Sequence, residues 1–129
     1  MNRFSLQFPL VIFLFICLPL SLTAQGDGWD FGEGAIVLPD DQGVRFRVYA
    51  PGANTVSVAG DFNNWDAGAN MMQRDADGYY ATTVADASPG QEYKFVVNGT
   101  LWRKDPWSLQ VTGSHEDANS VIVDLNAYE

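Results

Sequence analysis

The sequence predicts an all-β protein built as a single antiparallel β-sandwich. Apolar and polar residues alternate along several short stretches, for example 44–49 and 56–59, which is the period-two pattern of half-buried strands. Clusters of Gly, Pro, Asn and Asp separate these stretches at intervals of about ten residues. No segment of useful length has helical periodicity. Many short strands with regular turns and no helices are typical of a sandwich.

Seven or eight strands are expected. The stretches with the clearest alternation or β-branched and aromatic content are 44–49, 56–59, 80–85, 93–97, 100–104 and 121–125. Turns are expected at 40–43, 75–78, 88–90 and 98–99. Asn98-Gly99 is the strongest hairpin turn in the sequence.

Residues 1–24 have the pattern of a secretory signal peptide. Arg3 precedes an apolar run at 10–20, and small residues lead to Ala24 at the expected cleavage point. The run is short for a permanent span of roughly 20 apolar residues, although an uncleaved anchor stays open as an alternative. We therefore expect a secreted or periplasmic protein with a flexible leader at 25–34 and one domain at 35–129.

The expected mature chain is acidic and lacks cysteine. Cys17 is the one cysteine and lies in the signal peptide, so no disulfide is expected after export. Without Arg3, six Lys and Arg stand against sixteen Asp and Glu, a net charge near −10. Such a charge disfavours nucleic acid and, after signal cleavage, an anionic membrane surface. A neutral ligand or another protein fits better, and no cofactor is implied.

Two segments carry the candidate binding residues. Residues 58–66 read V-A-G-D-F-N-N-W-D and raise Trp65 on a polar turn, while residues 93–107 contain Lys94, Trp102 and Trp107. If Tyr93 faces the core, period two turns Lys94 outward. Trp107 follows a proline and is expected to be a packing residue. One cation with exposed aromatic rings favours binding of a flat, neutral ligand over catalysis.

These segments resemble carbohydrate-binding module family 48. The similarity rests on residues 43–51, 56–66 and 93–108 and covers nearly all of the expected domain, with G-D-F-N-N-W and Y-K-F-V-V-N-G followed by D-P as its most specific parts. The family occurs in glycogen branching and debranching enzymes, and residues 58–125 are also similar to the glycogen-binding module of the AMP-activated protein kinase beta subunit. The resemblance implies an immunoglobulin-like sandwich of the early-set type.

The resemblance also implies a site for α-1,4-glucan such as glycogen, starch or a maltooligosaccharide. In the family two tryptophans carry the sugar chain, and a lysine and an asparagine bond its hydroxyls. The matching positions here are Trp65, Lys94, Trp102 and Asn119. Trp102 lies one residue later than in the family pattern, and residues 114–117 replace a loop that carries a leucine in kinase-type modules.

Catalytic and metal-binding alternatives are weaker, so we expect no enzyme activity. Glycosidases need two carboxylates across a cleft, but the acids near turns, at positions 61, 66, 75, 77 and 105, are explained by turn formation. The single His115 forms neither a zinc site nor a triad. Residues 75–78 begin like a calcium loop but lack its later ligands.

A second function class stays open beside glucan binding. The chain could be a non-binding immunoglobulin-like docking domain that serves, or derives from, a glycoside hydrolase family 13 enzyme. An amylolytic enzyme acting in trans would then be its partner.

Overall fold

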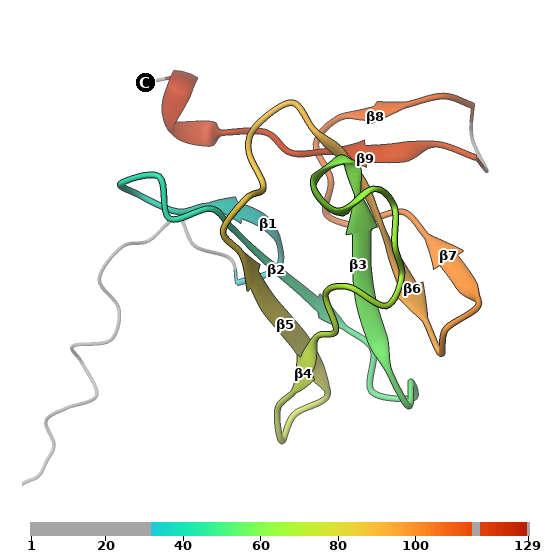
Figure 1. Cartoon of the computed structure of the whole chain (residues 1–129). Coiled ribbons are helices and arrows are strands. Elements are labelled where there is room, and N and C mark those ends of the chain that lie inside the picture. Colours follow the sequence, from blue (N-terminus) through green and yellow to red (C-terminus); the bar gives the residue numbers. More distant parts are fainter. Residues whose placement is uncertain (1–31, 115–116, 129) are drawn as a thin grey trace, which may run out of the picture. The chain divides into compact units, whose positions relative to one another are not determined.

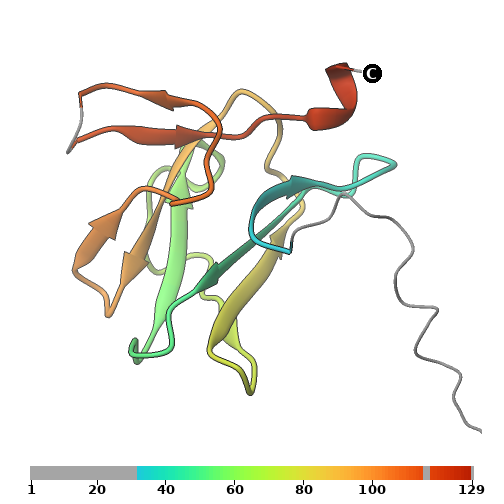
Figure 2. The same ribbon diagram turned by 180° about the vertical axis from the view of Figure 1, so that it is seen from behind.

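A computed structural model of the chain describes residues 32–114 and 117–128. The signal peptide expected at 1–24 and most of the leader expected at 25–34 lie outside this part. The described residues form two antiparallel sheets and short 3-10 turns, so the expected all-β, immunoglobulin-like sandwich is confirmed. Figures 1 and 2 show the two layers from opposite sides.

The first sheet has four strands in the order β1-β2-β5-β4. Its strands are β1 (Gly34–Val37), β2 (Val44–Tyr49), β5 (Tyr79–Val84) and β4 (Gln73–Arg74). β2 and β5 pair over their whole length, from Val44 opposite Val84 to Tyr49 opposite Tyr79. The period-two pattern of β2 therefore buries Val44, Phe46 and Val48 on one side of this sheet.

The second sheet has five strands and is centred on β6 (Figure 1). Its strands are β3 (Val56–Gly60), β6 (Glu92–Val97), β7 (Leu101–Arg103), β8 (Val111–Thr112) and β9 (Asn119–Val121). β3 pairs with β6 along one edge. Along the other edge of β6, β7 pairs with its second half and β9 with its first two residues. β8 then extends the sheet beyond β9.

The core between the sheets is aromatic at its centre. The ring of Phe46 lies 4.9 Å from that of Tyr93 and 5.4 Å from that of Phe62, and Tyr93 lies 5.8 Å from Phe95. These contacts join β2 of the first sheet to β6 of the second. Aromatic pairs at such distances add about 0.5–1.5 kcal/mol each beyond burial of their area.

A crossing segment links the sheets after β3. The 3-10 turn η3 (Asp61–Asn63) follows β3 directly, and the chain then returns along the edge of β3, where Met71 bridges to Ser57. The backbone continues into β4 of the first sheet. This path fixes the turn that carries Trp65 at the Gly60 end of β3.

Several expected boundaries differ from the structure. The strand expected at 121–125 is β9, which ends at Val121, and residues Leu125–Tyr128 form the 3-10 turn η4. The apolar run after Val121 continues to bond, but its partners are loop residues: the Ile122 backbone bonds to Gly90 and Gln91 before β6 begins. β1, β4 and β8 were not expected, because strands of two to four residues are too short to show alternation. β1 begins at Gly34, within the leader expected at 25–34.

Candidate functional site

The candidate site lies on the outer face of the second sheet, the side turned away from the core. Tyr93 and Phe95 are 1% and 2% exposed and face the core, so Lys94 between them lies on the outer face, as predicted. The outer face is formed by Ser57 and Ala59 of β3, Glu92, Lys94 and Val96 of β6, Trp102 of β7, and Asn119 and Val121 of β9.

Strand register brings three of the four predicted residues together on this face. Trp102 is directly opposite Val96, two residues from Lys94 on the same side of β6. Continuing the β6/β9 register by one residue places Asn119 opposite Lys94. Paired residues on one face have Cβ atoms about 5 Å apart. Lys94, Trp102 and Asn119 are therefore neighbours, although they come from three strands.

Trp65 is held by an unusual turn. Asn64 and Trp65 both have left-handed backbones, with φ of 57° and 59°, and a tryptophan in this region is uncommon. The turn is fixed from within: the side chain of Asn63 accepts from the Gly60 N–H at 3.0 Å and donates to the Val58 carbonyl at 3.0 Å. Backbone strain of this kind costs of order 1–3 kcal/mol and is concentrated at functional sites.

Asp61 connects this turn to the sheet. Its Oδ1 accepts a hydrogen bond from the indole Nε1 of Trp65 at 3.1 Å, and its Oδ2 accepts one from the backbone N–H of Glu92 at 2.8 Å. Trp65 is half-buried and its indole N–H is occupied. The turn therefore holds the indole near the Glu92 end of β6.

Glu92 continues the chain of hydrogen bonds across the sheet. Its Oε1 accepts from Asn119 Nδ2 at 2.8 Å and from Thr112 Oγ1 at 2.9 Å. Trp65, Asp61, Glu92 and Asn119 thus form one connected series. The sequence offered no reason to select Asp61 or Glu92 for this role, because each is one of sixteen acids and Glu92 contacts Asn119 only through the fold.

The polar groups of the site suit a neutral ligand rich in hydroxyls. Within the described part of the chain, Lys94 makes no side-chain hydrogen bond or ion pair, so its three donors are available. The Asn119 amide nitrogen already donates to Glu92, which leaves its carbonyl oxygen as an acceptor. Trp102 is 39% exposed and offers apolar surface beside these groups.

Trp107 differs from its expected packing role. It is 53% exposed, and its indole donates to Glu33 Oε1 at 2.9 Å. Its Cβ lies near Gly34 of β1, away from the outer face. Trp107 is therefore a surface tryptophan outside the candidate site.

Asp105 forms a turn, as expected, because its Oδ1 and carbonyl oxygen accept from the backbone N–H groups of Trp107 and Ser108, but it is also a buried carboxylate. It is 1% exposed, its Oδ2 accepts from the Tyr93 hydroxyl at 2.5 Å, and its Oδ1 accepts from the Trp107 N–H at 2.8 Å. Burial raises the pKa of Asp105, while the bond from Tyr93 lowers it in part. Burial, with the charge of Asp105 added, also raises the pKa of Tyr93. Both groups serve the core beneath the site.

The described residues were also compared with the requirements of a metal site and of a membrane span. They contain no group of three or more His, Cys, Asp or Glu side chains placed to hold a metal. None of their helical segments is long and apolar enough to cross a membrane. His115 and Glu116, in the loop where kinase-type modules carry a leucine, lie outside the described residues.

Comparison with known proteins agrees with this architecture. Residues 33–111 match the model of carbohydrate-binding module 48, described as the isoamylase N-terminal domain. Among curated proteins, the 1,4-alpha-glucan branching enzyme GlgB of Aliivibrio fischeri is 36% identical over 92 residues, covering 68% of this chain and 13% of the enzyme. The GlgB of Thermosynechococcus vestitus is 37% identical over 102 residues, covering 74% and 13%. The chain thus spans about an eighth of the length of these relatives.

Solved structures support the same relationship. A candidate alpha amylase of Salmonella typhimurium superposes with a TM-score of 0.59 at 32% identity, over 72% of this chain and 15% of that one. PulA of Klebsiella pneumoniae, solved with maltotriose, superposes with a TM-score of 0.55 at 25% identity, over 73% and 11%. The chain belongs to carbohydrate-binding module family 48, as its sequence motifs indicated.

Proposed function

We propose that this protein binds α-1,4-glucan on the outer face of the second sheet and has no catalytic activity of its own. Trp65 and Trp102 carry the sugar chain, and Lys94 and Asn119 bond its hydroxyls. The observation that supports this most strongly is the strand register, which gathers Lys94, Trp102 and Asn119 on the side of the sheet opposite to Tyr93 and Phe95.

The chemistry of the ligand matches these groups. A glucosyl ring presents C–H groups on its faces and hydroxyls at its rim. An indole can cover the ring face without leaving a polar group unpaired, and a few side-chain donors and acceptors at the rim give orientation. Lys94 supplies donors and the Asn119 carbonyl an acceptor, which suits hydroxyls because they both donate and accept. A neutral polymer also avoids repulsion by the acidic surface.

The test is binding of glycogen and maltoheptaose by the domain and by single-tryptophan variants. Trp65→Ala and Trp102→Ala should each weaken binding by about one to two decades, because a covering aromatic contributes on the order of 1–3 kcal/mol. Trp107→Ala is the matched control, since it removes an exposed tryptophan outside the site. It should leave the affinity unchanged.

Calorimetry with thermal melting separates binding from folding. Parent-like affinity in both site variants, or unfolding of both, would place the platform elsewhere. Pure protein should also release no reducing sugar from glycogen or starch. Release that is abolished by changing an acid on the outer face would overturn the non-enzymatic assignment.

Export and independent action are part of the proposal. The N-terminal pattern supports secretion or periplasmic delivery with cleavage after Ala24, and mass spectrometry of the exported protein tests the cleavage point. A domain that acts alone should bind glucan without an added enzyme.

Docking to a partner enzyme is the second candidate function. It is favoured by exposed apolar side chains at alternate positions after β7, namely Trp107, Leu109 and Val111. In that case the parent protein should not bind glucan in the titrations. An amylolytic enzyme should instead bind the domain, and substitution of these three residues should weaken that binding.

A further inference from the structure

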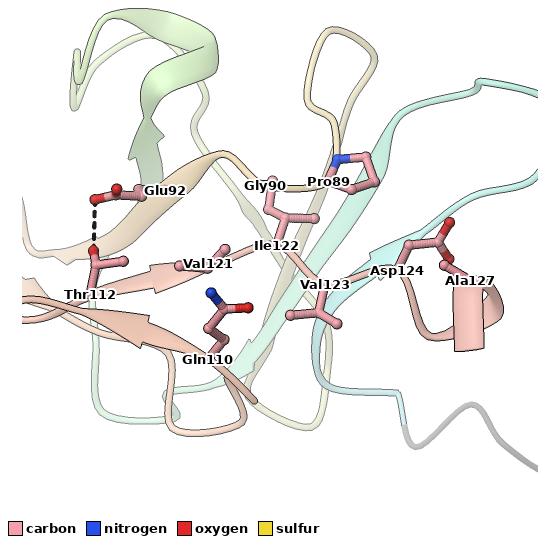
Figure 3. Close-up of a pocket in the computed structure, with 10 residues that line it drawn as sticks. All are labelled: Pro89, Gly90, Glu92, Gln110, Thr112, Val121, Ile122, Val123, Asp124 and Ala127. Carbon is pink, nitrogen blue, oxygen red and sulfur yellow. Dashed lines mark hydrogen bonds between the residues drawn. The ribbon is translucent and has the colours of Figure 1, made fainter.

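A hollow of about 340 Å³ adjoins the Glu92 end of the outer face (Figure 3). Its lining includes Glu92 of β6, Thr112 of β8 and Val121 of β9, together with Gly90, Gln110 and Asp124 from the neighbouring loops. Figure 3 shows Gln110 and Thr112 beside Val121, with Ile122 and Val123 continuing the lining away from Glu92. The hollow thus combines an aliphatic surface with amide, hydroxyl and carboxylate groups.

The hollow is continuous with the candidate glucan site through shared residues. Glu92 lines the hollow and also accepts the hydrogen bond from Asn119. Val121 is directly opposite Glu92 in the β6/β9 pairing, so its side chain lies on the outer face. From Val96, opposite Trp102, to Glu92 is four residues, or about 13 Å at the rise of a strand. A ligand that lies along β6 from Trp102 would therefore reach the hollow.

The lining has the composition of a sugar subsite. Binding hollows combine an apolar wall with a few polar groups that fix orientation, and Val121, Val123 and Ala127 provide such a wall. In the described part of the chain the Gln110 side chain makes no hydrogen bond, so its amide can both donate and accept. Glu92 Oε1 is occupied by Thr112 and Asn119, which leaves Oε2 as an acceptor for a hydroxyl.

We propose that this hollow is an additional subsite that holds a glucosyl unit of the same chain, beyond the units carried by Trp65 and Trp102. The inference rests on the proposed glucan-binding function. It assigns Gln110 and Glu92 to this unit, and it predicts that affinity increases with glucan length until the chain fills the hollow.

The experiment compares maltooligosaccharides from maltotriose to maltoheptaose in calorimetric titrations of the parent protein and two variants. Gln110→Ala removes the free amide, and Ala127→Tyr narrows the hollow from η4. Gln110→Ala should weaken maltoheptaose binding about fivefold, which corresponds to roughly one hydrogen bond. Ala127→Tyr should also weaken maltoheptaose binding, because the new ring fills space that the glucosyl unit needs. Both variants should bind maltotriose as the parent protein does. Gln73→Ala, an exposed glutamine on β4 of the other sheet, is the matched control and should change neither.

Nuclear magnetic resonance gives a second readout that does not depend on affinity. The backbone amides of Gly90 and Gln110 should shift with maltoheptaose and not with maltotriose. The subsite is wrong if both variants keep the parent's dependence of affinity on glucan length and the resonances of these two amides do not shift. Loss of binding in the tryptophan variants would then still support the tryptophan platform. If the parent binds no maltooligosaccharide, the proposed function fails and the subsite fails with it.

Discussion

The buried bond between Tyr93 and Asp105 should contribute measurably to stability. Both residues are 1% exposed, and their oxygens lie 2.5 Å apart. Tyr93→Phe removes the donor without changing the ring and leaves a buried carboxylate one partner short. Loss of one partner of a buried polar pair costs about 1–3 kcal/mol, and more when the partner is charged. We expect a loss of about 2 kcal/mol at pH 8, or a melting temperature lower by about 10 °C for a domain of this size.

The pH dependence of this loss gives the sharper test. Burial raises the folded-state pKa of Asp105, so the folded protein binds this proton more tightly than the unfolded chain does. The resulting stabilisation is present at low pH and is lost as pH rises through the folded-state pKa. The hydrogen bond from Tyr93 lowers the pKa of Asp105. Without this bond the pKa of Asp105 should be higher, and the free energy of unfolding should depend more strongly on protonation of Asp105. Tyr93→Phe should therefore destabilise less at pH 5 than at pH 8.

A matched control is available in Tyr80. It is also buried, but its hydroxyl donates to the neutral carbonyl of Ala53 at 2.8 Å. Tyr80→Phe should cost about 1 kcal/mol with no added pH dependence between pH 5 and 8. Chemical unfolding of the three proteins at both values measures the effect. A loss below about 0.5 kcal/mol for Tyr93→Phe, typical of a surface change, or equal losses at both pH values, would refute the role assigned to this bond.

Three further outcomes are expected. Asp61→Ala should weaken glucan binding several-fold by releasing the Trp65 indole, and it should lower the melting temperature modestly because the Glu92 backbone N–H loses its acceptor; an unchanged affinity in calorimetry would contradict this. Gly43→Ala should destabilise the protein by more than about 2 kcal/mol in urea unfolding, because Gly43 has a φ of +98° and the added Cβ would lie 2.2 Å from a backbone oxygen. Gly90→Ala is the control: Gly90 has a similar φ of +91° but open space around it, so the change should cost about 1 kcal/mol. The folded-state pKa of Tyr93 is raised above the ordinary 10.0, so Tyr93 contributes stability that is lost as pH rises above that value. The melting temperature of the parent protein should therefore decrease more between pH 9 and pH 11 than that of Tyr93→Phe.

The sequence predicted those features that depend on local pattern. Alternation located β2, β3 and β6, and the same parity of apolar and polar residues correctly placed Lys94 on the outer face. The family motifs added Trp65, Trp102 and Asn119. Their proximity could not come from local pattern, because it depends on how β7 and β9 share one edge of β6.

The features that were missed depend on contacts between distant residues. Asp105 follows a lysine and precedes a proline, a context that correctly predicts a turn but gives no sign of burial. Its burial results from partners on other strands: Tyr93 donates to its carboxylate, and Ser120 accepts from its backbone N–H at 2.8 Å. The surface position of Trp107 also involves a distant residue, because its indole bonds to Glu33, 74 residues away in sequence.

Asp61 and Glu92 act as acceptors that organise the candidate site, so the acidic composition is compatible with the neutral ligand that we propose. Asp61 joins the Trp65 turn to β6, and Glu92 joins β6 to Asn119 and to the β8 edge. Each carboxylate accepts hydrogen bonds from donors in different segments, and Glu92 Oε2 is left as an acceptor for the proposed ligand. Rigid strands supply the positions and the two acids fix the side chains upon them, which is the support that a preorganised binding site requires. Changes to Asp61 or Glu92 should therefore alter the affinity for glucan and not create or remove a reaction.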